Sequence, residues 1–186
     1  MQTLGIYEST PRSENRLKSL FWPSIDSGAD VDYLGVQGYW ICTLVSIVTL
    51  AALCMVGQPI MGIIFLLLYY IGGVGVREHS RYAVVTVFAF YVLNVVLSPG
   101  IVGIIFSAVL LSNVRATWIA ANWKPDSEES ILPPRMGGVW SDKLSDQLPA
   151  WLWPKVRILY YIFSAGLFLL VTMGLTAKLA IRAAGH

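Results

Sequence analysis

The sequence predicts an all-α integral membrane protein with about five transmembrane helices, and three observations predict it. Of the 186 residues, 56% are hydrophobic and only 13% are charged, whereas soluble domains carry roughly a quarter charged residues. Several apolar runs approach the roughly 20 residues that a membrane-crossing helix needs. Charged clusters and turn residues separate these runs. The net charge of +2, without a run of Lys and Arg, gives no reason to expect a nucleic-acid partner.

Residues 1–38 are predicted to form a polar segment in the cytoplasm. Leu17, Leu20 and Phe21 stand at i, i+3 and i+4, so they share one face of a short interfacial helix that ends before Pro23. Three acidic residues follow, Asp26, Asp30 and Asp32. They lack the ligand spacing and the terminal Glu of a calcium-binding loop, so a solvated connector is predicted.

The region 39–121 is predicted to hold four spans, beginning with a hairpin. Residues 39–56 and 59–76 contain no charged side chain. Gly57-Gln58-Pro59 lies between them, and a Pro in this place suits the first turn of a new helix. A charged cluster from Arg77 to Arg81 then predicts that the chain leaves the hydrocarbon.

The next apolar stretch, 82–121, is too long for one span. As a single helix it would extend about 60 Å, twice the thickness of the hydrocarbon. Ser98-Pro99-Gly100 near its middle predicts a tight turn between two spans, 82–97 and 100–121. A four-span alternative, in which the stretch crosses only once, remains open at this point.

The last long loop, 122–155, is predicted to lie in the cytoplasm and to carry an in-plane amphipathic helix at about 141–148. Ser141 is placed to cap this helix. Apolar residues recur on one face and are expected to lie at the lipid headgroups; they are Trp140, Leu144, Leu148 and Trp151. Region 156–186 then forms the last span, to about residue 177, and a short tail.

The distribution of basic residues predicts the orientation. Lys and Arg gather in cytoplasmic loops. With the N-terminus inside and the C-terminus outside, eleven basic residues lie on the inner side and two, Lys178 and Arg182, on the outer side. All seven tryptophans also fall on the inner side, where Trp22 and Trp153 join the loop residues in a predicted membrane or partner interface. We expect a bacterial inner membrane.

The spans offer little chemistry. Their middles lack Asp, Glu, Lys and His, and no nucleophile elbow or zinc motif occurs, so a non-enzymatic protein is predicted. Bound lipid or a chlorophyll-type pigment is the cofactor to consider. Such a pigment needs one axial ligand, which His79, Asn94 or Gln58 could provide.

Small residues give the best positive signal. Gly72, Gly73 and Gly75 cluster in the second span, and such patches let helices approach closely in lipid. The favoured function is an accessory or scaffold subunit of a larger membrane complex, for example an energy-transducing or photosynthetic one. Its expected partners are membrane lipids and other membrane subunits. The alternatives are a transporter or channel for a neutral or lipidic molecule, for which Asn94, Ser112 and Asn113 would have to converge, and a pigment- or quinone-binding subunit.

Overall fold

The computed structural model describes residues 28–97, 100–122 and 143–184, and these residues are helical except at short turns. The predicted all-α fold is thereby confirmed. The predicted N-terminal interfacial helix, Trp22 and Trp140 lie outside the described residues. The elements in chain order are α2 (Gly28–Met55), α3 (Pro59–Arg77), α4 (Arg81–Leu97), α5 (Ile101–Asn122), the π-helical turn η2 (Lys143–Gln147) and α7 (Leu148–Ala184).

Four of the helices in the described residues are long and apolar enough to cross a membrane. Their candidate membrane-spanning segments are Val31–Met55, Pro59–Arg77, Ile101–Ile119 and Leu148–Ala177. The fifth, α4, is apolar but has only 17 residues, which give a length of about 25 Å against roughly 30 Å of hydrocarbon. The chain is an all-α membrane protein, with α4 as its short helix.

The hairpin of α2 and α3 turns where the sequence predicts it. Gly57 adopts a positive φ of 78°, and the Gln58 N–H donates to the Leu53 carbonyl at 2.8 Å. Pro59 then begins α3. The start of α2 differs from the prediction, because the helix already begins at Gly28 and not at the first apolar run near residue 39. The polar residues before that run are accommodated in the helix because Asp32 has a basic partner on α3.

The turn between α3 and α4 is equally tight. His79 takes a left-handed backbone conformation with φ of 53°, a position that glycine or asparagine usually occupies after a helix. The Ser80 N–H donates to the Gly75 carbonyl at 2.9 Å, and the Ser80 hydroxyl accepts the Ala83 N–H at 3.4 Å. The chain therefore reverses at once, and α4 runs back along α3.

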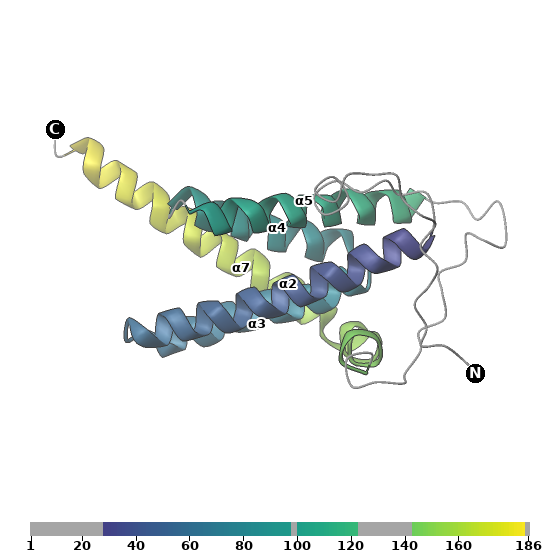
Figure 1. Ribbon diagram of the computed structural model, residues 1–186. Helices are drawn as coiled ribbons and strands as arrows, with labels where there is room; N and C mark the ends of the chain where they lie inside the picture. The colour runs from purple at the N-terminus through teal and green to yellow at the C-terminus, as the bar shows by residue number, and fades with distance from the viewer. Residues whose placement is uncertain (1–27, 98–99, 123–142, 185–186) are drawn as a thin grey trace, which may run out of the picture.

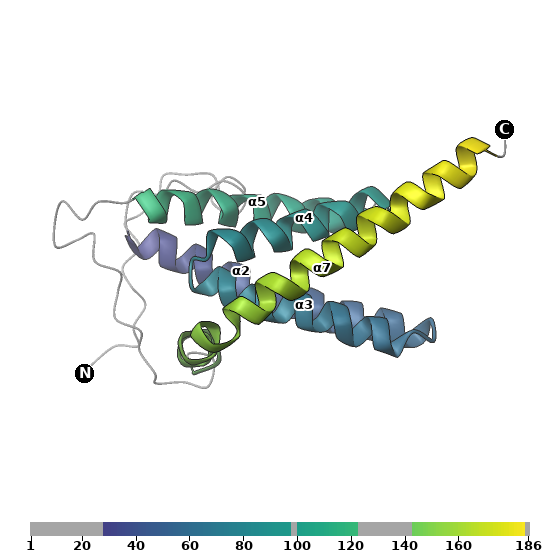
Figure 2. The ribbon, with the colours of Figure 1, turned by 180° about the vertical axis from the view of Figure 1, so that it is seen from behind.

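Helices α4 and α5 form a second hairpin. They lie side by side in both views (Figures 1 and 2), and a Cβ built on Gly103 would meet Val95 Cγ2 at 2.7 Å. The stretch 82–121 therefore makes two antiparallel helices, as predicted from its length.

The last helix differs from the prediction. The structure has no separate helix at about 141–148 among its described residues; η2 leads directly into α7, which begins at Leu148 instead of near 156. Pro149 has no N–H to donate, and the Ser145 carbonyl four residues before it accepts the Arg77 Nε–H instead. Pro154 lies inside α7, and the start of α7 stands at a steep angle to the rest (Figure 1), as expected where a proline interrupts a helix.

The two hairpins and α7 meet at one end and separate at the other (Figures 1 and 2). The end at which they meet is called the polar end; it comprises the start of α2, the α3–α4 turn, the end of α5, and η2. The end at which they separate is called the apolar end; it comprises the α2–α3 turn and the start of α5. Helix α7 crosses the bundle obliquely, and its C-terminal half extends away from it (Figure 2).

Candidate functional site

A cavity of about 630 Å³ lies between the two hairpins, toward the apolar end. The α-helices α2, α3, α4, α5 and α7 all contribute to its wall, although α7 supplies only Val171. Its lining residues are Leu44, Val45, Val48, Thr49, Ala52, Leu53, Phe65, Tyr69, Phe90, Tyr91, Leu93, Asn94, Leu97, Val102, Phe106 and Val171. The volume falls in the range of roughly 300–1,000 Å³ that is typical of small-molecule sites.

The wall of the cavity has two chemically different sides. Helix α2 contributes aliphatic residues and one threonine, Thr49. Helices α3, α4 and α5 contribute the aromatic rings, and these follow one another closely. Tyr69 and Tyr91 have ring centroids 6.2 Å apart, Phe65 lies 6.3 Å from Tyr69, and Phe106 lies 6.3 Å from Tyr91. The cavity thus joins an aliphatic side to an aromatic side.

Every polar group that lines the cavity is uncharged. These groups are the hydroxyls of Thr49, Tyr69 and Tyr91 and the amide of Asn94. Tyr69 and Tyr91 are buried, at 3% and 7% exposure. The described residues give none of these four side chains a hydrogen-bond partner. The cavity can therefore offer hydrogen bonds to a neutral molecule within an apolar surrounding.

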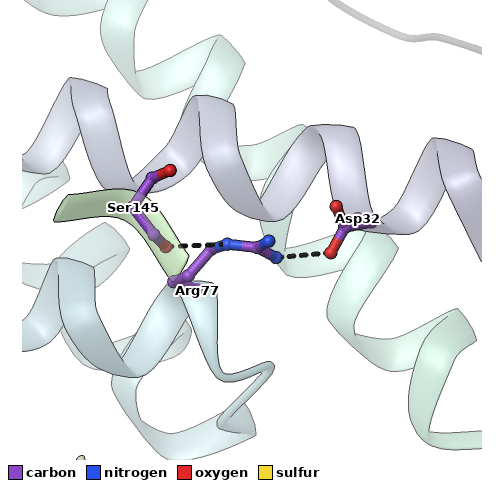
Figure 3. A network of polar contacts seen from close by, with 3 residues as sticks. All are labelled: Asp32, Arg77 and Ser145. Atoms are coloured by element: carbon purple, nitrogen blue, oxygen red, sulfur yellow. Dashed lines mark hydrogen bonds and ion pairs between the residues drawn. The ribbon is translucent and has the colours of Figure 1, made fainter. Parts of the chain in front are cut away.

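The polar end contains a second cluster, which is held together by Arg77. The Arg77 side chain is 1% exposed, and its Nη1 lies 2.6 Å from Asp32 Oδ1 on α2. Its Nε donates to the Ser145 carbonyl of η2 at 3.0 Å. Figure 3 shows the guanidinium between these two elements. A buried guanidinium is favourable only when its N–H groups are satisfied, so Arg77 ties α2, α3 and η2 to one another.

Close helix contacts fill the rest of the polar end. A Cβ built on Gly38 would collide with Asn113 Oδ1 of α5, and one on Gly75 would lie 2.5 Å from Trp153 of α7. The Tyr160 hydroxyl lies equally close to Gly72, at 2.6 Å from its built Cβ. Asn113 Oδ1 and the Tyr160 hydroxyl are buried without a hydrogen-bond partner, but the glycines opposite them leave no space for a ligand.

The three residues predicted as axial ligands of a pigment lie in three separate places. His79 forms the α3–α4 turn at the polar end, near Gly35. Gln58 is exposed at the opposite end, just before α3. Asn94 lines the cavity. The structure therefore brings none of these residues together, and it places only Asn94 beside a space that can hold a molecule.

The predicted interface residues of the loop also separate. Trp151 is 61% exposed and Leu144 is 40% exposed, and the Lys155 ammonium lies 3.6 Å from the centre of the Trp151 ring. Leu148 is half-buried. Trp153, by contrast, is only 7% exposed and packs edge-on against Tyr160 inside the bundle. Trp153 stands two residues after Trp151 in α7, about 200° further round the helix, so the two rings lie on opposite faces.

The polar residues proposed for a transport path do not converge. Asn94 lines the cavity, whereas Asn113 contacts Gly38 at the polar end. Ser112 and Asn113 both bond to the Val109 carbonyl of their own helix. Tyr69 and Tyr91 were missed by sequence reasoning, and the only available signal was that both are tyrosines within apolar spans.

No protein-family model matches this chain, and comparisons with curated proteins and with solved structures found no match either.

Proposed function

We propose that this chain is a non-enzymatic membrane protein that binds a lipidic molecule in the cavity between its two hairpins. The cavity is the observation that carries the proposal. Its wall comes from five helices, its lining carries no charge, and its volume is about 630 Å³. A space of this size left empty would forfeit the van der Waals contacts of its lining, so an apolar occupant stabilises the arrangement.

The location of the cavity also supports a lipidic occupant. It lies toward the C-terminal ends of α2 and α4, which carry no charged side chain. Many side chains at these ends are exposed on the surface of the bundle, which faces lipid in a membrane. Several apolar lining residues are more than half exposed: Val48 at 57%, Leu97 at 56% and Val102 at 63%. A molecule dissolved in the bilayer can therefore reach the cavity without passing through water.

The proposal keeps the predicted orientation, with the polar end at the cytoplasmic face of a bacterial inner membrane. Arg77, Arg81 and Arg115 all lie toward the polar end, on three consecutive helices. This distribution agrees with the enrichment of basic residues on the cytoplasmic side. Labelling of Cys54, which is exposed close to the α2–α3 turn, by a membrane-impermeant maleimide added to intact cells tests the orientation.

Two neighbouring alanines on α2 allow a matched test of the cavity. Both are exposed on α2, but Ala52 lines the cavity and Ala51 does not. Ala52→Trp places a large ring into the cavity, and a steric cost of about 1.4 kcal/mol would lower occupancy about tenfold. Ala51→Trp places the same ring into the surrounding lipid. The measurement is the amount of each lipid per chain, by mass spectrometry, after extraction in native-lipid nanodiscs.

The expected result is one lipid species enriched with the wild type and with Ala51→Trp, and depleted with Ala52→Trp. An absorption spectrum of the same preparations shows whether the species is a pigment. Equal lipid profiles for all three proteins would contradict the proposal.

A role as an accessory subunit is the second candidate, and the C-terminal half of α7 favours it. Ser164 is the last described residue of α7 that is buried. Beyond it, Gly166 and Gly174 have nothing within 4 Å of a built Cβ, and small residues of this kind permit close approach of another helix. Purification in a mild detergent tests this candidate: a stoichiometric membrane partner supports it, and a lone chain contradicts it.

A further inference from the structure

We propose that the molecule held in the cavity is of the quinone class, an uncharged flat ring that carries carbonyl oxygens and an apolar tail. The hydroxyls of Tyr69 and Tyr91 would donate hydrogen bonds to those oxygens. The inference rests on the proposed function, because it specifies the occupant of the same cavity.

The two tyrosine hydroxyls are the first argument. Both side chains are more than nine-tenths buried, both line the cavity, and their ring centroids lie 6.2 Å apart. Neither hydroxyl has a hydrogen-bond partner among the described residues. Both hydroxyl oxygens keep accessible surface, so a molecule in the cavity can reach them. A hydroxyl without a hydrogen bond is unfavourable in an apolar surrounding, and an acceptor oxygen on a ligand removes this cost. Purely hydrocarbon ligands leave both donors unsatisfied.

The absence of charge from the lining is the second argument. The remaining polar groups of the cavity are the Thr49 hydroxyl and the Asn94 amide. A carboxylate or a phosphate in this place would be desolvated without a cation among the lining residues, which is strongly unfavourable. The acceptor must therefore be neutral. Carbonyl oxygens on a ring meet this requirement, whereas the head groups of fatty acids and phospholipids do not.

The division of the wall is the third argument. Phe65, Tyr69, Tyr91 and Phe106 place aromatic rings on one side of the cavity, and a flat ring stacks favourably on such rings in an offset or edge-on geometry. Asn94 stands three residues after Tyr91 on α4, so both side chains lie on the same face of that helix. The aliphatic side, formed by α2, then accommodates the tail.

Two probes, both delivered in detergent, separate these contributions. One is a benzoquinone with a decyl tail, and the other is decylbenzene, which has the same tail and a ring without carbonyl oxygens. Delipidated protein in mild detergent is titrated with each probe, and the bound probe is counted after gel filtration. The wild type is expected to bind one quinone per chain, and to bind it about tenfold more tightly than decylbenzene, in line with the loss of two hydrogen bonds.

The variants remove the hydroxyls and keep the rings. Tyr69→Phe combined with Tyr91→Phe is expected to weaken quinone binding about tenfold and to leave decylbenzene binding unchanged. Tyr33→Phe is the matched control, since Tyr33 is 61% exposed on α2 and does not line the cavity. Each single variant is measured as well, so that the result does not depend on one protein that fails to fold.

The outcomes distinguish the inference from the proposed function. Equal affinities for both probes, or wild-type quinone binding by the double variant, would overturn the quinone inference. If Ala52→Trp still depletes a native lipid in that case, the proposed function stands without it. If neither probe binds and Ala52→Trp changes no lipid, both fail.

Discussion

The two ends of this bundle are built from similar apolar helices but pack in opposite ways. At the polar end, Gly38 and Gly75 bring helices so close that a Cβ would collide with the neighbouring side chain, and Arg77 joins three elements. Toward the apolar end, the same helices border an open cavity of about 630 Å³. Gly166 and Gly174 of α7 have nothing within 4 Å there.

The difference shows what holds helices together in lipid. Lipid tails are as apolar as leucine, so burial of apolar surface does not drive the helices together. Close packing at small residues and hydrogen bonds must do so. Glycines that bring one hairpin against the other or against α7, such as Gly38 and Gly75, lie near the polar end. Gly62 and Gly103, toward the apolar end, pack helices only within one hairpin, so the two hairpins separate there. The space that results is suited to a ligand.

The largest expected effect comes from the central residue of the polar end. Arg77→Ala leaves Asp32 and the Ser145 carbonyl without their partner, and breaking a buried ion pair of this kind costs about 3–5 kcal/mol. We therefore expect a large decrease in the free energy of unfolding, measured by SDS titration in mixed micelles. Arg157→Ala is the control, because Arg157 is exposed. Equal stability of the two variants would show that the Arg77 network does not hold this end together.

A matched pair of glycines compares the two ends directly. Gly75→Leu forces a side chain against Ala83 and Trp153, whose atoms lie 2.5 Å from the built Cβ, and overpacking of this kind costs about 1–3 kcal/mol. Gly174→Leu meets open space and gains up to about 1 kcal/mol of helix propensity. Thermal unfolding in detergent is expected to show a lower Tm only for Gly75→Leu. A lower Tm for Gly174→Leu would mean that α7 is packed along its whole length.

The smallest effect concerns the point at which α7 leaves the bundle. The Tyr82 hydroxyl of α4 lies 3.2 Å from the Ser164 hydroxyl of α7, and hydrogen bonds between membrane helices contribute about 0.6 kcal/mol on average. Tyr82→Phe should therefore lower the free energy of unfolding slightly. In a double-mutant cycle with Ser164→Ala, the coupling should be of this size, whereas Tyr33→Phe should show no coupling to Ser164→Ala.

Much of the fold could be predicted from local signals. Gly57 and Pro59 predicted the first turn because their backbone preferences are local. The length of the stretch 82–121 required a turn because one helix would exceed the bilayer. The early start of α2 at Gly28 could not be predicted, since nothing local to Asp32 indicates that Arg77, 45 residues later in the chain, neutralises it. The course of α7 through Pro154 likewise depends on packing against α3.

The candidate site was less predictable. Asn94 stood out as a polar residue in an apolar span, and the structure places it beside the cavity. Tyr69 and Tyr91 gave no comparable signal, because tyrosines in spans are common at membrane interfaces. The cavity depends on the angle between the two hairpins, which no local sequence pattern determines.

The central claim is that a ligand occupies the open cavity toward the apolar end, and that the polar end holds none. A crystal structure of the chain grown in a lipidic mesophase tests it most directly. We predict non-protein electron density between the Tyr69 and Tyr91 side chains and the aliphatic side of α2, and none between Gly38 and Asn113. Two hairpins packed together along their full length, with the cavity filled by protein side chains, would contradict the account.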